Sequence, residues 1–144
     1  MPSRADIIAA ARNWCGTPFH HRAALRGIGC DCIGLILGLY RDLYGRAAEP
    51  VPAYAADWGE LAFGEPLLDG LARHLEPVGP ERARPGDVLA FRWLPGRAIA
   101  HVAVLTAPGR MIHAHRRHGV REVALVPAFS RRLEHAFAFP GTED

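Results

Sequence analysis

The stretch Gly29-Cys30-Asp31-Cys32-Ile33-Gly34-Leu35 lies where a loop ends and a helix begins. Asp31 is a preferred N-cap residue, and the apolar run after it predicts a buried helix from about Asp31 to Tyr44 that ends at Gly45. Cys32 then occupies the first helical position, where unpaired N–H groups and the helix dipole stabilise a thiolate. The pattern indicates a reactive thiol. The competing interpretation is a small apolar side chain packed in a core helix.

The other two cysteines lack this setting. Cys30 precedes the N-cap, and Cys15 follows the predicted first helix, whose C-terminal end disfavours a thiolate. Cys30 and Cys32 are too close in sequence to form a favourable disulfide with each other, and three cysteines cannot all pair. We therefore expect at least one free thiol and structural roles for Cys15 and Cys30.

Helices precede strands along the chain. Helical spacing and an N-cap at Ser3 predict a helix from Ser3 to about Trp14, and a short helix is expected over Glu65–Leu75. Loops are expected over 19–29 and 46–64, and no function is assigned to the second. The candidate strands are Val88–Trp93, Ile99–Thr106, Arg110–His115, Val120–Val126 and His135–Phe139. This order predicts an α+β fold with N-terminal helices packed on a C-terminal antiparallel sheet.

Three histidines in the strand region are candidates for the base that a thiol nucleophile needs, His101, and for the group that orients this base, His113 or His115. His101 stands in an otherwise apolar strand, where a polar ring requires a partner. Alternation places His113 and His115 on one face of the next strand. A three-residue loop over 107–109 would pair residues whose numbers sum to 216, with His101 opposite His115 and diagonal to His113.

The catalytic interpretation depends on that pairing register, because it puts His101 and His113 on one face of the sheet. A two-residue loop would put His101 and His113 on opposite faces, so the interpretation requires an odd-length loop. It also requires the shared face to turn toward the start of the Cys32 helix. Spacing alone leaves open whether His113 or His115 is the partner of His101.

Length and composition indicate one ordinary globular domain over residues 1–144. The chain is 49% hydrophobic and 22% charged, and its formal charge of +2 gives no strong field for nucleic acid. The apolar run Cys32–Tyr40 is too short to span a membrane. Residues 1–6 lack the pattern of a secretory signal, so we expect the protein to be made in the cytoplasm.

The segments 29–35, His101-Val102-Ala103-Val104 and Ile112-His113-Ala114 together resemble the NlpC/P60 peptidases in order and spacing over most of the chain. The resemblance implies a small papain-like α+β fold without a cofactor, with Cys32 as nucleophile, His101 as base and His113 as the orienting third residue. It also implies cleavage of bacterial peptidoglycan peptides, commonly next to D-glutamate.

The segments Trp14–Phe19 and Phe137–Pro140 look most similar to phage-type cell-wall peptidases, a type also carried near the tail tip of gene transfer agents. That similarity implies incorporation in a phage-like particle, tail-tip or hub proteins as partners, and action in the periplasm.

Phe19 departs from the family pattern because many relatives have a tyrosine there. Phe19 cannot donate a hydrogen bond, so His20 or the backbone N–H of Cys32 would have to supply one to the oxyanion. Asp31, Phe19 and His20 are the candidate substrate or oxyanion residues. Ile33 also replaces the serine that often follows the nucleophile, a change expected to matter less.

Two alternatives remain. A zinc module could draw on Cys30, Cys32, His113, His115 and His118, but Cys-x-Cys is a poor zinc spacing and leaves His101 unexplained. A structural tail-tip component with weak or no activity is favoured by Phe19 and opposed by the retention of all three catalytic candidates.

Overall fold

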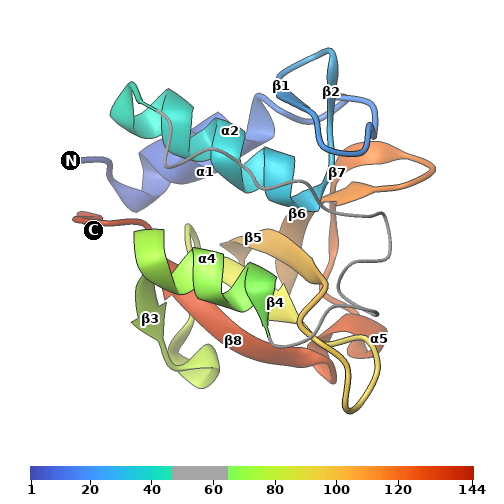
Figure 1. The fold of residues 1–144 in the computed structure, drawn as a ribbon. Coiled ribbons are helices and arrows are strands. Elements are labelled where there is room, and N and C mark those ends of the chain that lie inside the picture. Colours follow the sequence, from blue (N-terminus) through green and yellow to red (C-terminus); the bar gives the residue numbers. More distant parts are fainter. Residues whose placement is uncertain (47–64) are drawn as a thin grey trace.

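N-terminal helices and a six-stranded antiparallel sheet form two layers (Figure 1). The structure, a computed structural model, describes residues 1–46 and 65–144, so the loop predicted over 46–64 lies outside the described residues except for Arg46. The helices are α1 (Arg4–Arg12), α2 (Cys32–Tyr44), α4 (Pro66–His74), the short α5 (Pro127–Ser130) and the 3-10 helix η1 (Pro80–Arg82). In the described part of the chain, no helix is long and apolar enough to cross a bilayer.

The sheet order is β3-β8-β4-β5-β6-β7, and every neighbouring pair is antiparallel. Its strands are β3 (Glu76–Val78), β4 (Val88–Phe91), β5 (His101–Ala107), β6 (Arg110–His115), β7 (Gly119–Ala124) and β8 (Leu133–Ala138). A separate hairpin joins β1 (Ala24–Leu25) to β2 (Gly29–Cys30) within the predicted 19–29 loop. The α+β prediction is confirmed.

Helices α1 and α2 pack closely because one glycine leaves room for one large ring. The first helix starts with the predicted cap, in which Ser3 and Asp6 exchange hydrogen bonds. Trp14 lies after this helix against Gly38 of α2, where an added Cβ would come within 2.2 Å of the indole ring. The buried indole N–H donates to Asp42 at 2.9 Å, so the contact is both apolar and hydrogen-bonded.

Side chains alternate between the two faces of the sheet, and each face has its own core cluster. The face toward α1 and α2 includes Val88, Val102, Val104, Ile112 and Ala114. The opposite face includes Leu89, Phe91, Ala103, Leu105 and Met111, with Phe129 of α5 packed against it. The sheet is therefore buried on both sides.

The β5–β6 hairpin differs from the prediction in its loop but keeps the predicted register. Ala107 pairs with Arg110, so the loop is the two-residue Pro108-Gly109 turn, and the expected three-residue loop is wrong. A β-bulge just before Ala107 absorbs one residue of β5, and Val104 still pairs with Ile112 as predicted. The bulge thus restores the parity that an even-length loop would have reversed.

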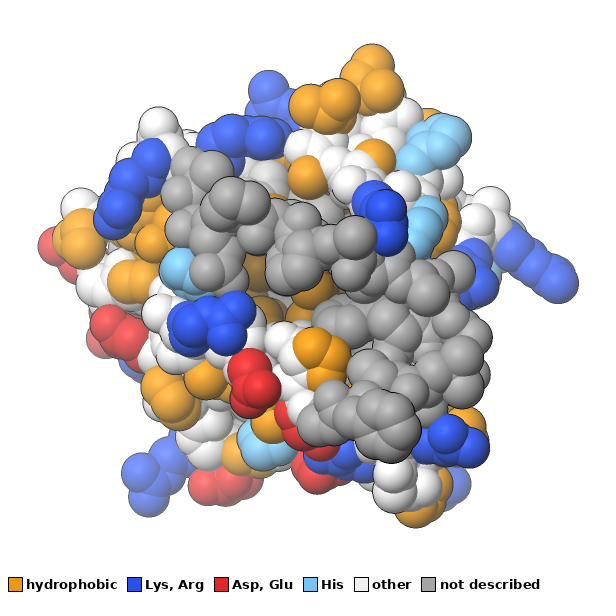
Figure 2. Space-filling model, in the orientation of Figure 1, with side chains coloured by type: hydrophobic (Ala, Val, Ile, Leu, Met, Phe, Trp, Pro, Cys, Tyr) orange, Lys and Arg blue, Asp and Glu red, His pale blue; other side chains and the backbone are white. Residues whose placement is uncertain are grey.

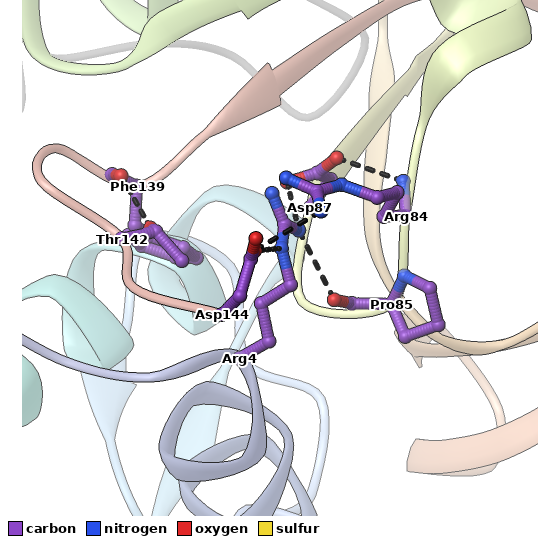
Figure 3. A network of polar contacts seen from close by, with 7 residues as sticks. All are labelled: Arg4, Arg84, Pro85, Asp87, Phe139, Thr142 and Asp144. Carbon is purple, nitrogen blue, oxygen red and sulfur yellow. Dashed lines mark hydrogen bonds and ion pairs between the residues drawn. The ribbon is translucent and has the colours of Figure 1, made fainter.

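A polar network fixes the first helix to the start of β4 and to the C-terminus (Figure 3). The Asp87 carboxylate, 1% exposed, accepts hydrogen bonds from Arg4 Nη1 and the Arg84 backbone N–H, both at 2.8 Å. Arg4 also donates to Pro85 O at 3.1 Å and contacts Asp144 at 3.3 Å. A buried carboxylate with several donors stabilises this junction more than an exposed pair would.

Candidate active site

Asp31 holds the start of α2 by the predicted N-cap geometry. Its Oδ1 atom accepts a hydrogen bond from Gly34 N at 2.7 Å, and Cys32 is the first residue of the helix. Oδ2 accepts from Arg22 N at 2.8 Å, and the His21 ring lies 3.8 Å from the same oxygen. Asp31 is only 4% exposed. Its carboxylate therefore joins the preceding loop to the helix through buried hydrogen bonds.

The loop before the helix also contacts it through backbone atoms. A Cβ on Gly34 would come within 1.8 Å of Ala23 O, so only glycine fits this crossing. Ala23 O accepts a hydrogen bond from Asp31 N at 3.3 Å. Arg22, just before it, adopts φ 66°, a left-handed conformation stabilised by its hydrogen bond to Asp31. These contacts fix the backbone on which Cys32 stands.

The Cys32 thiol lies against the backbone on both sides of His101. Its Sγ atom is 4.0 Å from Ala100 O, and the backbone N–H groups of Val102, Ile33 and Cys32 itself lower the pKa of the thiol. Burial, followed by the negative charge of Asp31, outweighs them and raises the pKa of Cys32 to about 12. The resting side chain is therefore a neutral thiol.

His101 and His113 form the hydrogen-bonded pair that their shared strand face predicted. Nε2 of His101 lies 2.9 Å from Nδ1 of His113, and the two residues are 9% and 4% exposed. His115, the other candidate partner, uses its Nδ1 to accept from the N–H groups of Arg117 and His118 in the following turn. The structure thus pairs His101 with His113.

Both imidazoles of the pair are neutral at ordinary pH. Burial, and then the neighbouring rings of His113 and His115, lower the pKa of His101 to about 3. Burial and His115 lower the pKa of His113 to about 4. A neutral imidazole has a lone pair, so His101 is able to accept a proton.

Along β5 and β6, His101 and His113 project from the face opposite the core cluster that packs against α1 and α2. His101 alternates with Val102, and His113 alternates with Ile112, and both valine and isoleucine side chains face α1 and α2. The Cys32 thiol nevertheless reaches the backbone of β5 on both sides of His101, so the expectation that the shared histidine face turns toward the helix start stays a prediction. Among the described residues, Sγ of Cys32 has the Ala100 carbonyl, rather than the His101 ring, as its hydrogen-bond partner.

Three aromatic side chains surround the histidine pair, and the sequence did not single them out. Trp93 stacks on His101 with ring centroids 5.2 Å apart, and Phe91 lies 6.0 Å from the same ring. Phe129 of α5 meets His113 edge-on at 5.4 Å. Phe91 and Trp93 belong to the predicted strand Val88–Trp93, but the sequence did not place that strand beside His101, as the structure does for β4. Phe129 carried no signal because its short helix was not predicted.

Phe19 and His20 lie beside the helix start without an evident catalytic contact. Phe19 is half-buried against the main core and forms a parallel bridge with Cys30. The His20 ring is packed over Gly29, where a Cβ would come within 2.5 Å of it. Among the described residues, backbone N–H groups rather than either side chain are the donors near the Cys32 sulfur.

Of the remaining cysteines, Cys30 is fully buried and Cys15 is exposed, and the structural roles expected for them stay predictions. In residues 1–46 and 65–144, no three histidine, cysteine, aspartate or glutamate side chains gather into a possible metal site. The zinc alternative therefore has no supporting cluster in that part of the chain.

A basic edge flanks the start of α2. Thr17 joins the β1–β2 hairpin to the β6–β7 turn, since its hydroxyl accepts from Gly27 N at 2.9 Å and its carbonyl accepts from Val120 N at 2.9 Å. In Figure 2, arginine and histidine side chains lie among apolar and other side chains toward the upper right of the view, where Figure 1 places these two hairpins. The exposed residues of the basic edge are His20, His21, Arg22, Arg26, Arg116, Arg117 and His118.

The fold and site define an α+β protein with a cysteine at a helix start beside a buried histidine pair. The NlpC/P60 family profile matches residues 14–133, and the chain belongs to the NlpC/P60 family. No curated protein matches the chain significantly.

Solved structures agree with this assignment. The NlpC/P60 domain of the peptidoglycan hydrolase SagA is 21% identical, with a TM-score of 0.68 over 95% of this chain and 99% of that one. An NlpC/P60 family protein from Bacillus cereus is also 21% identical, with a TM-score of 0.68, and the match covers 96% of this chain but 40% of that longer one. RipD from Mycobacterium tuberculosis, described as a non-catalytic NlpC/P60 domain protein adapted to peptidoglycan binding, is 18% identical, with a TM-score of 0.59 over 95% of this chain and 96% of that one.

Proposed function

We propose that the protein is a cysteine endopeptidase that hydrolyses peptide bonds in the stem peptides of bacterial peptidoglycan. The observation that carries this proposal is a half-buried thiol at a helix start, held against the backbone that flanks His101, whose ring is hydrogen-bonded to His113. Membership of the NlpC/P60 family and the description of SagA as a peptidoglycan hydrolase support the choice of substrate.

The tautomer of His101 determines its role. Nε2 of His101 is occupied by His113, so Nδ1 is the nitrogen that takes the thiol proton. For this, Nε2 carries the hydrogen and donates to Nδ1 of His113. The Cys32 side chain turns from the Ala100 carbonyl to His101 when substrate binds, because catalytic hydrogen bonds commonly tighten only in the complex.

The chemistry then proceeds in two displacements. The Cys32 thiolate attacks the peptide carbonyl carbon, and the C–S bond forms as the carbonyl oxygen becomes an oxyanion. His101 gives its proton to the leaving nitrogen as the C–N bond breaks, which leaves a thioester. A water molecule loses a proton to His101 and attacks the thioester, which releases a carboxylate and restores the thiol. Backbone N–H groups beside Cys32 are suited to stabilise both oxyanions.

The basic edge supports a carboxylate-bearing substrate. Its arginine and histidine side chains come from the loop before Cys32 and from the turn after His115. Such a surface attracts anionic groups and raises their local concentration.

Alanine substitution of two cysteines tests the proposal. With purified peptidoglycan as substrate, we expect Cys32→Ala to abolish the release of peptide fragments detected by mass spectrometry. The exposed Cys15 provides the matched control, and Cys15→Ala should retain release. Undiminished release by the Cys32→Ala variant would overturn the proposed mechanism.

A non-catalytic peptidoglycan-binding role, as described for RipD, is the second candidate function. Phe19 favours it because this side chain offers no hydroxyl to the site. Binding of the wild-type protein to insoluble peptidoglycan without any fragment release would support this second function over the first.

We also propose that a phage-like particle, either a virion or a gene transfer agent, carries the protein to the periplasm. The support is the resemblance of segments 14–19 and 137–140 to phage-type peptidases, and Trp14 and Phe139 in these segments are fully buried in the main core. Mass spectrometry of purified particles tests the proposal. Finding the protein only in particle-free fractions of a producing culture would contradict it.

A further inference from the structure

Trp93 is the large aromatic side chain stacked on His101. The two ring centroids are 5.2 Å apart and the ring planes are inclined by 28°. Trp93 also stacks on Phe91 at 5.9 Å and 14°, and it contacts Phe129 at 5.8 Å. It is partly exposed, whereas Phe91 is fully buried. Trp93 therefore covers the outer side of the imidazole on a base of apolar rings.

The segment from Trp93 to Ala100 is anchored at its start. Arg92 precedes the indole and donates to Glu134 Oε2 at 2.6 Å and to Glu65 Oε2 at 2.8 Å. Arg92 also donates to Arg97 O within the segment. The Trp93 carbonyl oxygen accepts a hydrogen bond from Arg132 Nε at 3.2 Å.

The same segment is anchored again just before His101. Glu65 uses its second oxygen, Oε1, to accept a hydrogen bond from Ile99 N at 2.8 Å. One carboxylate thus binds Arg92 at one end of the segment and Ile99 at the other. The next residue, Ala100, supplies the carbonyl oxygen that contacts the Cys32 thiol. The backbone that carries Trp93 is therefore fixed relative to both His101 and Cys32.

In the part of the chain that the structure describes, the protonated form of His101 has no carboxylate partner. The titratable groups that face its ring are His113 and His115 from β6. The Cys32 thiol lies at the backbone of Ala100 and Val102 on either side of His101, with Asp31 acting on that thiol. The uncharged ring of Phe91 from β4 lies against His101, and that of Phe129 from α5 lies against His113. Among the described residues, neither His101 nor His113 accepts or donates a hydrogen bond to a carboxylate. The orienting partner is a neutral imidazole, so the proton on His101 needs stabilisation from elsewhere.

We propose that Trp93 is a positioning residue for the reaction, which holds the His101 ring in place and stabilises its imidazolium form through the π face of the indole. A cation within about 6 Å of an indole centroid is attracted by the negative face of the ring, and the attraction grows where water is excluded. The inference rests on the proposed function, since it assumes that His101 takes the Cys32 proton. It assigns to Trp93 a charge-stabilising role that no carboxylate in residues 1–46 and 65–144 fills.

Two substitutions of Trp93 distinguish stabilisation of the imidazolium by the π face of the indole from simple shielding of the His101 ring by an apolar side chain. Trp93→Phe keeps an aromatic face over the imidazole, whereas Trp93→Leu keeps an apolar cover without one. The readout is the pH dependence of Cys32 alkylation by iodoacetamide, measured by peptide mass spectrometry, since formation of the thiolate–imidazolium pair limits this reaction and no substrate is needed. Thermal unfolding of each variant verifies folding, and Trp93→Met replaces the leucine variant if the latter does not fold.

We expect Trp93→Leu to slow alkylation of Cys32 near neutral pH by about threefold to tenfold and to move the rate profile to higher pH. Trp93→Phe should stay within about twofold of the wild type, since its ring still presents a π face. Equal rates for the leucine variant and the wild type would overturn the inference. Equal slowing by leucine and phenylalanine would overturn it too, because packing alone would then explain the effect.

Two further measurements distinguish failure of this inference from failure of the proposed function. His101→Ala should slow alkylation of Cys32, and an unchanged rate would show that His101 does not act on the thiol, which contradicts the role of Trp93. Peptidoglycan hydrolysis by the wild-type enzyme is assayed separately. A chain that shows the Trp93 effect but releases no peptides retains the coupled thiol and imidazole, and only the proposed substrate is then wrong.

Discussion

His101 and His113 meet across β5 and β6 with Nε2 of the first ring 2.9 Å from Nδ1 of the second, and the ring planes are inclined by 88°. The nearly perpendicular arrangement aims one nitrogen of His113 at the edge of the His101 ring. A hydrogen bond of this kind fixes both the tautomer and the orientation of the base. The partner is neutral, which separates this pair from a histidine held by a carboxylate.

The first prediction distinguishes the two histidines that the sequence left open. His113→Ala removes the acceptor for His101 Nε2 and should lower kcat/KM for peptidoglycan peptides by about 100-fold, since an unoriented base loses much of the benefit of general base catalysis. His115→Ala is the matched control, because His115 bonds to the turn at Arg117 and His118, and it should retain activity within about threefold. A larger loss with His115→Ala than with His113→Ala would contradict the assignment.

The second prediction concerns stability in acid. In the folded state burial lowers the pKa of His101 to about 3 and that of His113 to about 4, from 6.5. The unfolded chain therefore binds more protons than the folded chain at these sites below pH 6.5, and the free energy of unfolding should fall as pH drops from there toward about 3. Above pH 6.5 this contribution is fully present.

Urea unfolding at a series of pH values measures the effect. The double variant His101→Gln/His113→Gln lacks both groups, so its stability should depend less steeply on pH between about 4 and 6.5 than that of the wild type. The internal control is the range above pH 7, where the free energy of unfolding should change with pH equally in the double variant and in the wild type. An equally steep pH dependence of the free energy of unfolding in both proteins between about pH 4 and 6.5 would show that groups other than His101 and His113 govern the loss of stability in acid.

Local sequence signals predicted the elements that carry Cys32 and the histidines. The Asp31 cap, the Gly45 stop and the alternation of His113 gave the start of α2 and the strand face correctly. The pairing register was also correct, but the loop was two residues long, and the bulge that compensated for it had no sequence signal. A bulge depends on how two strands fit together, which a single stretch of sequence does not specify.

Tertiary contacts account for what the sequence left out. The two-residue strands of the β1–β2 hairpin and the four-residue α5 are too short to show a period, and Pro77 disfavoured a strand at β3. The stacking of Trp93 on His101 and the contact of Cys32 with Ala100 depend on loop geometry fixed by Arg92 and Glu65. Residue types alone could not place these groups.

The third prediction compares two glycines in helix interiors. A Cβ at Gly38 would come within 2.2 Å of the Trp14 indole, so Gly38→Ala should lower the free energy of unfolding by about 1–3 kcal/mol through overpacking. At Gly70 in α4 the nearest atom is the tip of Arg73 at 3.8 Å, and Gly70→Ala should raise the free energy of unfolding by about 0.5–1 kcal/mol through helix propensity. Chemical denaturation of the two variants provides the comparison, and a stabilising Gly38→Ala would contradict the packing of α1 on α2.

The last prediction concerns the charge of Asp31, which caps α2 but also disfavours the Cys32 thiolate. Its carboxylate is the second cause, after burial, of the raised pKa of that thiol. Asp31→Asn removes the charge and should lower the pKa of Cys32, so iodoacetamide should label Cys32 faster at pH 7. Labelling of the exposed Cys15 serves as the internal reference and should not change.

The same substitution should cost stability. The two carboxylate oxygens of Asp31 accept from Gly34 N and Arg22 N, and an asparagine has one oxygen for these two donors. We expect the free energy of unfolding to fall by about 1–3 kcal/mol, because one buried N–H loses its acceptor. A stable Asp31→Asn variant whose Cys32 reacts more slowly would show that the Asp31 charge supports the thiolate–imidazolium pair. In that case the capping carboxylate would assist the formation of the nucleophile that it is here inferred to oppose.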